Sequence, residues 1–318
     1  MAPLQMRPLG RSGLAAAPLA FGGNVFGWTA DEATSFRLLD TFVDAGFNLI
    51  DTADVYAIWA PGNRGGESET IIGRWLKRTG KRERVLIATK VGHDMKEGGK
   101  GLARAHILKS VDLSLARLQV ECIDLYQSHV EDPDTPHEEV LATYAGLIKA
   151  GKIRAIGASN FKVATLRAAL DASKRCALPR YETLQPLYNL CDRADFEAEL
   201  AALCREEGIG VIPFFSLASG FLTGKYRTEA DLAQSVRGNR VKKYLDERGH
   251  RILAALDEVA AQLASTPGKV AIAWLMARPG ITAPIASGRT VAQVQDLIDA
   301  TRLVLDASAM IRLDQASA

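Results

Sequence analysis

The stretch Leu19-Ala-Phe21-Gly22-Gly23-Asn24-Val25-Phe26-Gly27 decides between the two folds that an alternation of strands and helices allows. A short apolar run, too short for a helix, leads here directly into glycines. In a doubly wound open sheet, the first strand usually leads into Gly-x-Gly-x-x-Gly at the start of a helix. The glycines here lack that spacing, and no helical pattern follows directly. The stretch therefore favours a closed barrel.

Further short apolar runs follow along the chain, and amphipathic segments of helical periodicity alternate with them. Strands that alternate with helices pair in parallel, with the helices as crossovers. The whole pattern is α/β and predicts a (β/α)8 TIM barrel. The predicted strands are 19–21, 47–50, 85–88, 123–126, 155–158, 183–185, 211–214 and 281–285. The predicted helices are 31–45, 67–78, 103–118, 137–150, 161–173, 193–207, 251–264 and 290–300.

Three segments depart from this alternation. Residues 4–16 predict an N-terminal hairpin with its turn at Gly10-Arg11-Ser12-Gly13, and residues 217–250 predict a long loop after strand 7. Residues 267–280 predict an extra helix before strand 8. Because no repeat, low-complexity tract or linker divides the chain, we expect residues 1–318 to form a single barrel domain.

Composition argues against several classes of protein. Among 318 residues, 39 are Lys or Arg and 37 are Asp or Glu, a net charge of +2 that disfavours a nucleic-acid binder. The 4 cysteines show no ligand pattern with histidines, so we expect no metal site and a reducing compartment. No signal peptide is evident, and no apolar stretch reaches the ~20 residues that a membrane span needs. We therefore expect a cytoplasmic protein without membrane contact, and its oligomeric state is open.

Polar, ionisable or aromatic residues stand at or just beyond the ends of six consecutive predicted strands, from strand 2 to strand 7. In a barrel these ends meet on the face where active sites lie. The most informative residues are Asp51, Tyr56, Lys90 and His129. A cationic Lys90 beside Tyr56 would lower the tyrosine pKa from its usual value of about 10, and Asp51 would keep Lys90 charged. His129 could donate a hydrogen bond to a carbonyl oxygen, so the set suits a reaction that protonates an oxygen.

These residues belong to a longer series of motifs, and through them the chain resembles the aldo-keto reductases from Gly10 to about Leu305. The resemblance implies reduction of aldehydes and ketones, with Tyr56 as general acid, Lys90 and Asp51 tuning it, and His129 orienting the carbonyl. The motifs are Asp51-Thr-Ala-Asp-Val-Tyr56, Gly66-Glu-Ser-Glu69, Ala88-Thr-Lys90-Val-Gly92, Ile123-Asp-Leu-Tyr-Gln-Ser-His129, Gly157-Ala-Ser-Asn160-Phe161, Gln185-Pro-Leu-Tyr-Asn189 and Leu217-Ala-Ser-Gly-Phe-Leu-Thr-Gly-Lys-Tyr226.

The resemblance also implies a nicotinamide cofactor, since no side chain donates hydride. It places the carboxamide near Gln185 and the nicotinamide ring on Phe214, where the family usually has Tyr or Trp. It places the pyrophosphate near Lys225 and a 2′-phosphate near Arg289. We expect NADPH on account of Arg289. NADH is the alternative, because Gln293 and Leu297 stand where the family often has a basic residue and an asparagine. The cofactor residues implied are Gly22, Gly23, Asn24, Asp51, Ser159, Asn160, Gln185, Phe214, Phe215, Leu217, Ser219, Gly220, Lys225, Ser287, Arg289, Gln293 and Asp296.

At the substrate end, Trp28, Trp59 and Tyr188 predict an aromatic rim beside Tyr56 and His129, which suits an apolar or aromatic carbonyl compound. The remaining histidines, at positions 93, 106, 137 and 250, are predicted to face solvent or to cap helices. The basic run Arg237, Arg240, Lys242 and Lys243 predicts either a solvated face or a lid over the cofactor phosphates.

Two other functions remain open at this stage. The resemblance extends to the β subunits of voltage-gated potassium channels, which makes a non-enzymatic NADP(H)-binding regulatory subunit the first alternative. A barrel lyase or isomerase that uses Lys90 as a Schiff-base nucleophile is the second. Asp51 argues against the second, because a carboxylate partner would keep the lysine protonated.

Overall fold

A parallel eight-stranded sheet, in which the strands follow one another in chain order, forms the centre of the protein. The computed structural model describes residues 4–236 and 238–318. The order within the sheet is β10-β3-β4-β5-β6-β7-β8-β9. The strands are β3 (Ala20–Gly22), β4 (Leu49–Asp51), β5 (Leu86–Val91), β6 (Ile123–Ser128), β7 (Ile153–Ser159), β8 (Thr183–Gln185), β9 (Gly210–Val211) and β10 (Ile285–Ala286).

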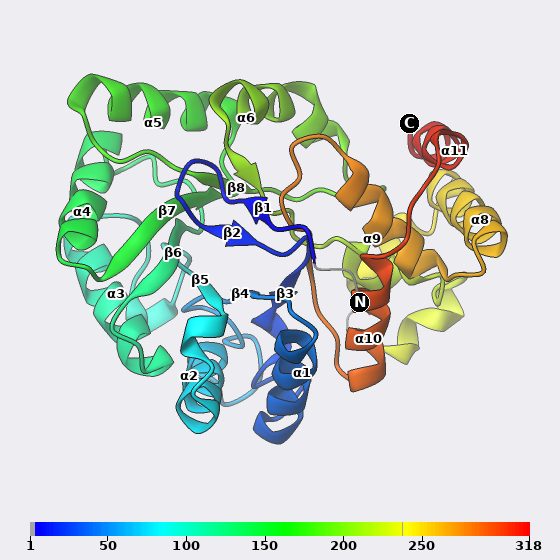
Figure 1. Cartoon of the computed structure of the whole chain (residues 1–318), viewed down its shortest axis with the longest axis horizontal. Helices are drawn as coiled ribbons and strands as arrows, with labels where there is room; N and C mark the ends of the chain where they lie inside the picture. The colour runs from blue at the N-terminus through cyan, green and yellow to red at the C-terminus, as the bar shows by residue number, and fades with distance from the viewer. Residues whose placement is uncertain (1–3, 237) are drawn as a thin grey trace.

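The two ends of this sheet meet. Thr282 N donates to Val211 O, and Ile285 N donates to Pro213 O, so the segment leading into β10 pairs with β9. These bonds close the sheet into the predicted (β/α)8 barrel, with helices around the outside (Figure 1). Each of the eight predicted apolar runs overlaps or adjoins one of these strands.

The helices alternate with the strands, as predicted. Asp31 accepts a hydrogen bond from Thr34 N at the start of α1, and Gly46, Gly151 and Gly208 follow helices with positive φ angles of 95°, 72° and 64°. The helices are α1 (Glu32–Asp44), α2 (Glu67–Thr79), α3 (Arg104–Leu118), α4 (His137–Lys149), α5 (Val163–Cys176), α6 (Ala201–Glu207), α7 (Gly238–Val241), α8 (Glu247–Gln262), α9 (Pro267–Ala277), α10 (Val291–Ala300) and α11 (Ala307–Ser317).

Two of the predicted irregular features are confirmed, and one helix was not predicted. The hairpin of β1 (Arg7–Pro8) and β2 (Ala15–Ala16) is antiparallel, and α9 is the extra helix before the last strand. The C-terminal helix α11 packs against α8 and was not expected from the sequence (Figure 1). None of the helices in the described residues is long and apolar enough to cross a membrane.

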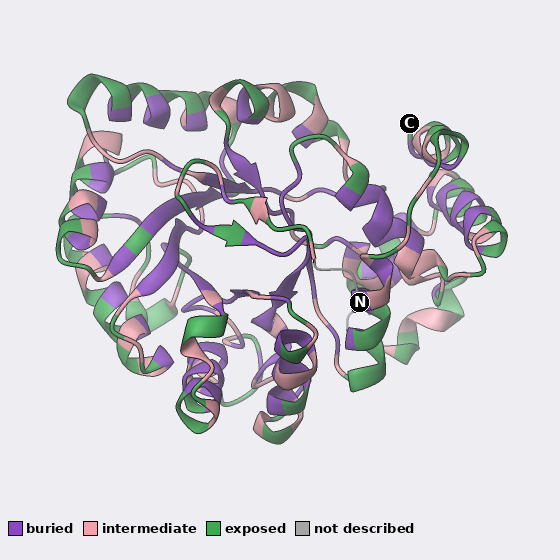
Figure 2. Cartoon of the chain, in the orientation of Figure 1, coloured by how far each residue is buried: buried purple, intermediate pink, exposed green. Residues whose placement is uncertain are grey.

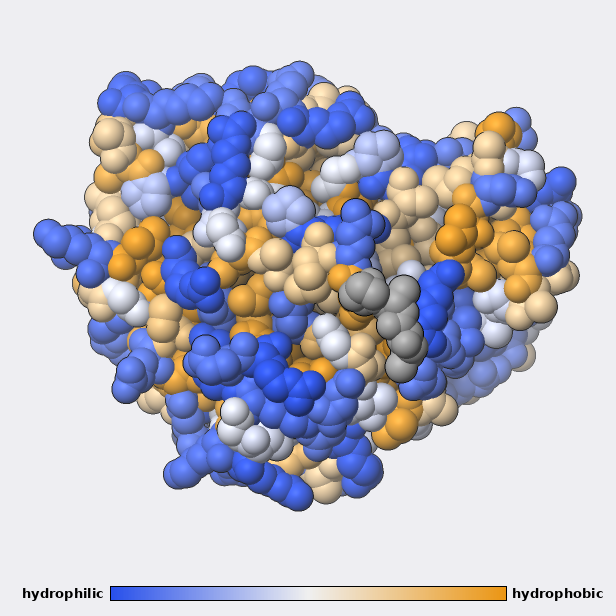
Figure 3. Space-filling model, in the orientation of Figure 1, coloured by the Kyte–Doolittle hydropathy of each residue, from blue (hydrophilic) through white to orange (hydrophobic). Residues whose placement is uncertain are grey.

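The hairpin covers the amino ends of the barrel strands. Arg11 N donates to Glu182 Oε2 just before β8, and Thr282 Oγ1 donates to Pro8 O. Figure 3 shows the face that carries the hairpin, where hydrophilic areas mix with scattered hydrophobic ones. The opposite face, formed by the carboxyl ends of the strands, is therefore the open one.

The barrel has two apolar cores. The larger lies between strands and helices and includes Trp75, Tyr126 and Trp274, all fully buried. The smaller lies inside the barrel, where Leu49, Ala88, Leu125 and Ala155 meet residues from the hairpin. In Figure 2 the barrel strands are mostly buried, whereas each helix is buried on its inner side and exposed on its outer side.

Candidate active site

A polar layer lies directly above the inner apolar core. Because side chains alternate along a strand, residues two positions further along point to the same interior. Leu49 is thus followed by Asp51 on β4, and Ala88 by Lys90 on β5. Leu125 is followed in the same way by Gln127 on β6. This two-residue spacing therefore places a layer of ionisable and polar side chains at the carboxyl end of the barrel, directly above the inner apolar core. We call it the ionisable layer.

Lys90 is the centre of this layer. It is fully buried, and its ammonium group donates to Asp51 Oδ2 at 2.8 Å, to Thr52 O at 2.7 Å and to Tyr56 Oη at 2.9 Å. These three bonds use all three ammonium hydrogens. Tyr56 in turn donates to Asp51 Oδ2 at 3.2 Å. The predicted Asp51, Tyr56 and Lys90 are thus brought into direct contact.

The other side chains around Asp51 hold its carboxylate in place. Gln185 Nε2 donates to Asp51 Oδ1 at 2.8 Å, and Gln127 Nε2 lies 3.5 Å from the same oxygen. Asn160 has a left-handed φ of 56°, and its Nδ2 donates to His129 O and to Ser159 Oγ. The amide of Gln185, expected at the carboxamide, is therefore already bonded to Asp51 in the ionisable layer.

Burial controls the protonation of Tyr56. Burial first, then the charge of Asp51 and the hydrogen bond to it, raises the pKa of Tyr56 well above its ordinary value. The expected lowering by Lys90 was wrong, because burial of the phenol and the adjacent carboxylate outweigh the ammonium group. Tyr56 consequently carries its proton at neutral pH, as an acid that donates to an oxygen must.

His129 is neutral in the same surroundings. Burial first, then the charges of Lys90 and His93, lowers the pKa of His129 well below its ordinary value. Its ring centroid lies 6.1 Å from that of Tyr56, and its Nδ1 is buried with no hydrogen-bond partner among the described residues. A neutral imidazole here can donate one hydrogen bond without repelling the nearby ammonium group.

The geometry of Lys90 argues against a Schiff-base mechanism. A lysine nucleophile must be unprotonated and must reach the substrate. Lys90 is fully buried, does not line the cavity described below, and has all three hydrogens bonded. Burial lowers its pKa, but Asp51 opposes that shift at a contact of 2.8 Å.

A cavity of about 740 Å³ begins at Tyr56 and His129 and continues over the open face of the barrel to Arg289. Every predicted site residue lines it except Gly23, Lys90 and Tyr188. Gly23 is buried beneath, where an added Cβ would lie 2.8 Å from Ser68 Oγ. Segments far apart in the sequence thus form one continuous depression, from the phenol of Tyr56 to the guanidinium group of Arg289.

The far end of the cavity is partly neutralised. Lys269 lies 2.9 Å from Asp296, and Gln293 Oε1 accepts from Arg289 N at 2.7 Å. Lys225 and Arg240 also line the cavity and are exposed. The amide of Gly220, one of the implied cofactor residues, donates to Leu217 O within its own loop.

Of the three described residues of the basic run in the long loop, one reaches this cavity. Arg240 lines it, whereas Lys242 pairs with Glu229 and Lys243 with Asp192, each at 3.2 Å. Arg237 lies outside the described residues. Among the described residues of this run, only Arg240 is placed to act as part of a lid.

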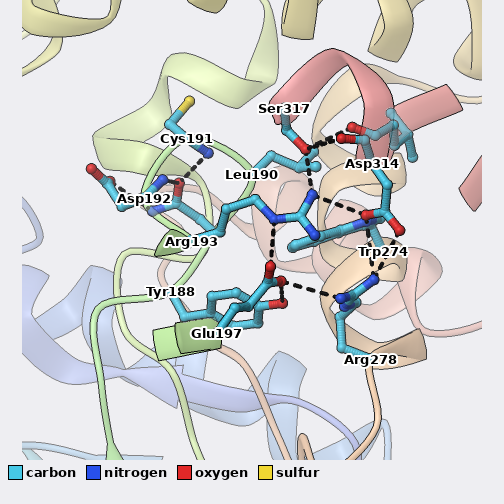
Figure 4. Close-up of polar contacts among 12 residues, drawn as sticks. Tyr188, Leu190, Cys191, Asp192, Arg193, Glu197, Trp274, Arg278, Asp314 and Ser317 are labelled. Carbon is cyan, nitrogen blue, oxygen red and sulfur yellow. Dashed lines mark hydrogen bonds and ion pairs between the residues drawn. The ribbon is translucent and has the colours of Figure 1, made fainter. Parts of the chain in front are cut away.

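The predicted aromatic rim is present in two of its three members. Trp28 and Trp59 line the cavity with their ring centroids 5.7 Å apart, and Trp59 lies 6.0 Å from Tyr56. Tyr188 lies elsewhere: it is buried against Trp274, and its hydroxyl donates to Glu197 (Figure 4). Its side chain points outward between barrel and helices, where Glu197 satisfies the hydroxyl, so its prediction as a rim residue was wrong.

Sequence reasoning gave no role at the site to three residues around the quartet of Asp51, Tyr56, Lys90 and His129. His93 lines the cavity beside His129. Asp54 and Glu69 are buried near Lys90, and Glu69 accepts from Thr89 Oγ1 and from Arg117 Nε. Both carboxyl groups stand in motifs quoted above, but their burial could only be recognised once the helices were placed.

Known proteins show which family this geometry belongs to. The model of the aldo/keto reductase family matches residues 18–318. The chain belongs to the aldo/keto reductase family. This confirms the resemblance inferred from the motifs and agrees with the closed barrel.

Several relatives align with this aldo/keto reductase over most of its length. An uncharacterized oxidoreductase of Bacillus subtilis, YrpG, is 35% identical over 94% of this chain and 91% of its own. The aldo-keto reductase yakc [NADP(+)] of Schizosaccharomyces pombe is 29% identical over 88% and 81%. A probable voltage-gated potassium channel subunit beta of Arabidopsis thaliana is 30% identical over 95% and 92%. The family and the two relatives named as reductases or oxidoreductases support an oxidoreductase.

Proposed function

We propose that this protein reduces aldehydes or ketones to alcohols with NADPH, and that Tyr56 donates the proton. The observation that carries the proposal is the contact of Tyr56 Oη with Lys90 Nζ at 2.9 Å, at the wall of a large cavity. When bound, the reduced nicotinamide supplies the hydride to the carbonyl carbon. The carbonyl oxygen then takes its proton from the phenol, so carbon and oxygen each gain one hydrogen.

Each residue of the quartet has a separate task in this proposal. Tyr56 keeps its proton until negative charge develops on the oxygen, because its pKa is raised. The Lys90 ammonium, which donates to Tyr56 Oη, stabilises the phenolate that remains. Asp51 keeps Lys90 oriented, and the neutral His129 donates to the carbonyl oxygen and fixes its direction.

The residues of the cavity fit an extended dinucleotide. The cavity extends from the quartet to Arg289, and its volume of about 740 Å³ is that of a site for a large ligand. Phe214 and Phe215 would offer an aromatic face to the nicotinamide, and Lys225 and Arg240 would meet the pyrophosphate. Arg289 would bind a 2′-phosphate, and the NADP(+) in the name of the fission-yeast relative supports this preference.

Trp28 and Trp59 support an apolar or aromatic carbonyl compound as substrate. With Val55 and Ile58 they line the end of the cavity next to Tyr56. Flat, apolar walls stabilise the hydrocarbon part of such a ligand by excluding water.

Replacement of Tyr56 by phenylalanine tests the proposal. We expect wild-type protein to oxidise NADPH when it is given aldehydes or ketones from a panel, and to oxidise NADPH faster than NADH. In Tyr56→Phe the rate should fall by about 10²- to 10⁴-fold, because general acid catalysis is lost, while cofactor binding persists. Nicotinamide absorbance measures turnover, and quenching of tryptophan fluorescence measures binding.

Tyr226→Phe is the matched control. Its hydroxyl is buried with no partner among the described residues, so its removal breaks no hydrogen bond. Full activity in Tyr56→Phe would refute Tyr56 as proton donor. A preference for NADH would refute the assignment of Arg289 to a 2′-phosphate.

The same assay separates the second candidate function, a non-enzymatic NADP(H)-binding regulatory subunit. The relative named as a potassium channel subunit beta favours this candidate. Cofactor binding by wild-type protein without turnover of any carbonyl compound would support it. The complete quartet around Lys90 favours the enzyme.

A further inference from the structure

His93 brings a second imidazole to the substrate end of the cavity. It follows β5 directly after Gly92, whose φ of 113° lets the chain turn over the barrel rim. His93 is exposed and lines the same cavity as Tyr56 and His129. Its ring centroid lies 5.2 Å from that of His129. A substrate in contact with His129 therefore lies within reach of His93.

One hydrogen bond fixes which nitrogen of His93 can donate. Asp94 N donates to His93 Nδ1 at 2.9 Å. In the neutral ring, a nitrogen that accepts cannot carry the proton, so the proton lies on Nε2. Among the described residues, none accepts from Nε2 or donates to it. His93 thus offers a directed N–H group whose partner must come from solvent or from a ligand.

We propose that His93 is a specificity residue that donates this hydrogen bond to a second, uncharged oxygen next to the reacting carbonyl group. The inference rests on the proposed function. His129 and Tyr56 hold the carbonyl oxygen that is reduced, and His93 holds its neighbour. The substrate class is accordingly vicinal dicarbonyl compounds and 2-hydroxy ketones or aldehydes.

Charge decides between a neutral and an ionised second group. Asp94 lines the same cavity and is exposed beside His93. A 2-oxo acid would bring its carboxylate close to this aspartate, and like charges repel. Lys90, which contacts Tyr56 at the reacting end, is already paired with Asp51. A neutral oxygen avoids the repulsion and still accepts from His93 Nε2.

Two ketones that differ by one oxygen test the inference. 1-Phenyl-1,2-propanedione and phenylacetone share a skeleton, and only the dione has an oxygen next to the shared methyl ketone. We expect wild-type protein to favour the dione in kcat/KM. In His93→Phe, which keeps a ring against His129, the ratio of dione to phenylacetone should fall about 3- to 10-fold, as expected for one neutral hydrogen bond.

Two further variants separate donation from packing. His93→Gln keeps an N–H donor and should restore most of the ratio. His137→Gln, at the start of α4 and outside the cavity lining, should leave the ratio unchanged. The greater reactivity of the dione does not affect the comparison, because every variant is measured on both ketones. An unchanged ratio in His93→Phe, or an equal loss on both ketones, would overturn the proposal.

A binding measurement keeps this inference distinct from the proposed function. Calorimetric titration of the dione into the complex with NADP+ should show binding about 3- to 10-fold weaker for His93→Phe than for wild type. If no variant reduces either ketone but this difference remains, the proposed function fails and the donor role of His93 stands. If turnover occurs and dione binding is the same in both proteins, the donor role fails alone.

Discussion

Asp54 has a carboxyl group that the proposed reaction does not use. It is buried, and its Oδ1 has no hydrogen-bond partner among the described residues. Burial, followed by the charge of Glu69, raises the pKa of Asp54 to about 8, although Arg117 acts in the opposite direction. The group is therefore a neutral acid at pH 7, behind a lysine that must remain charged.

This protonation predicts how stability changes with pH. An unfolded aspartate loses its proton near pH 4, whereas Asp54 keeps it to about pH 8 in the folded protein. The folded state binds the extra proton in this window, so stability falls as the pH rises from 4 to 8. Asp54→Asn removes this loss, and its free energy of unfolding relative to wild type should rise by up to a few kcal/mol between pH 5 and pH 8.

Urea unfolding at the two pH values measures the change. Asp171→Asn, on the exposed side of α5, is the control and should follow the wild-type dependence. If Asp54→Asn also follows it, the carboxyl group is ionised in the folded state and the assignment is wrong.

At single positions, the sequence predicted which residues come together better than it predicted their protonation states. The spacing of Asp51, Tyr56 and Lys90 brought these residues together as expected. The direction of the Tyr56 pKa could not be predicted, because it depends on how deeply the phenol is buried and which carboxylate oxygen it meets. His93 is exposed, in line with the prediction that it faces solvent or caps a helix, but nothing local showed that it also lines the cavity.

Among the elements, the packing of α2 on α3 depends on a residue without a side chain. A Cβ added at Gly73 would lie 2.1 Å from Arg117 O, far inside contact distance. In α4, by contrast, Gly146 has nothing within 4 Å of the same position. The first glycine permits two helices to approach closely, and the second only weakens its own helix.

These two glycines predict opposite effects of one substitution. Gly146→Ala should raise the free energy of unfolding by about 0.5–1 kcal/mol, since alanine has the better helix propensity. Gly73→Ala should lower it by about 1–3 kcal/mol, because the helices must move apart. Chemical denaturation of both variants measures the difference, and a shift of the same sign in both would contradict the packing argument.

Helix α11 shows why some elements escape sequence analysis. Its segment 307–317 is short, and only Ala309, Leu313 and Ser317 are buried. Helices of this length are marginal in water without tertiary contacts. The contacts that stabilise α11 come from residues far away in the sequence, so periodicity alone did not indicate it.

In the whole molecule, one polar network joins the C-terminus to the barrel. Asp314 on α11 accepts hydrogen bonds from Trp274 Nε1, Arg193 and Arg278 (Figure 4). The guanidinium carbons of Arg193 and Arg278 each lie 5.1 Å from the centroid of the Trp274 ring. Arg193 also donates to Ser317 Oγ near the end of the chain. The network thus links α11 to α9 and to the segment after β8.

Removal of Asp314 should loosen this link. Asp314→Ala leaves the indole N–H of Trp274 without an acceptor and removes one of the acceptors of Arg193 and of Arg278, which keep Glu197. It should cost roughly 1–2 kcal/mol of unfolding free energy, reduced by partial exposure to solvent. Thermal unfolding measures the loss. Gln315→Ala, exposed on the same helix, is the control, and an equal shift in both variants would mean that the network contributes little.

The barrel as a whole was predictable, because each buried parallel strand is a short apolar run and no fingerprint of an open sheet followed the first. The shape of its cavity was not. Tyr188 stands in a recognised motif but points away from the site, because its orientation depends on Glu197 and Trp274.

Closure of the barrel by residues 281–285 onto β9 also fixes the order in which the site is completed during synthesis. On the ribosome, Asp51, Tyr56, Lys90 and His129 emerge while the sheet still has an open edge. Ser287, Arg289 and Leu297, which form the far wall of the cavity, emerge only near the end of translation. A nascent chain that stops before residue 281 therefore carries all four residues of the quartet but only part of the wall of the cavity.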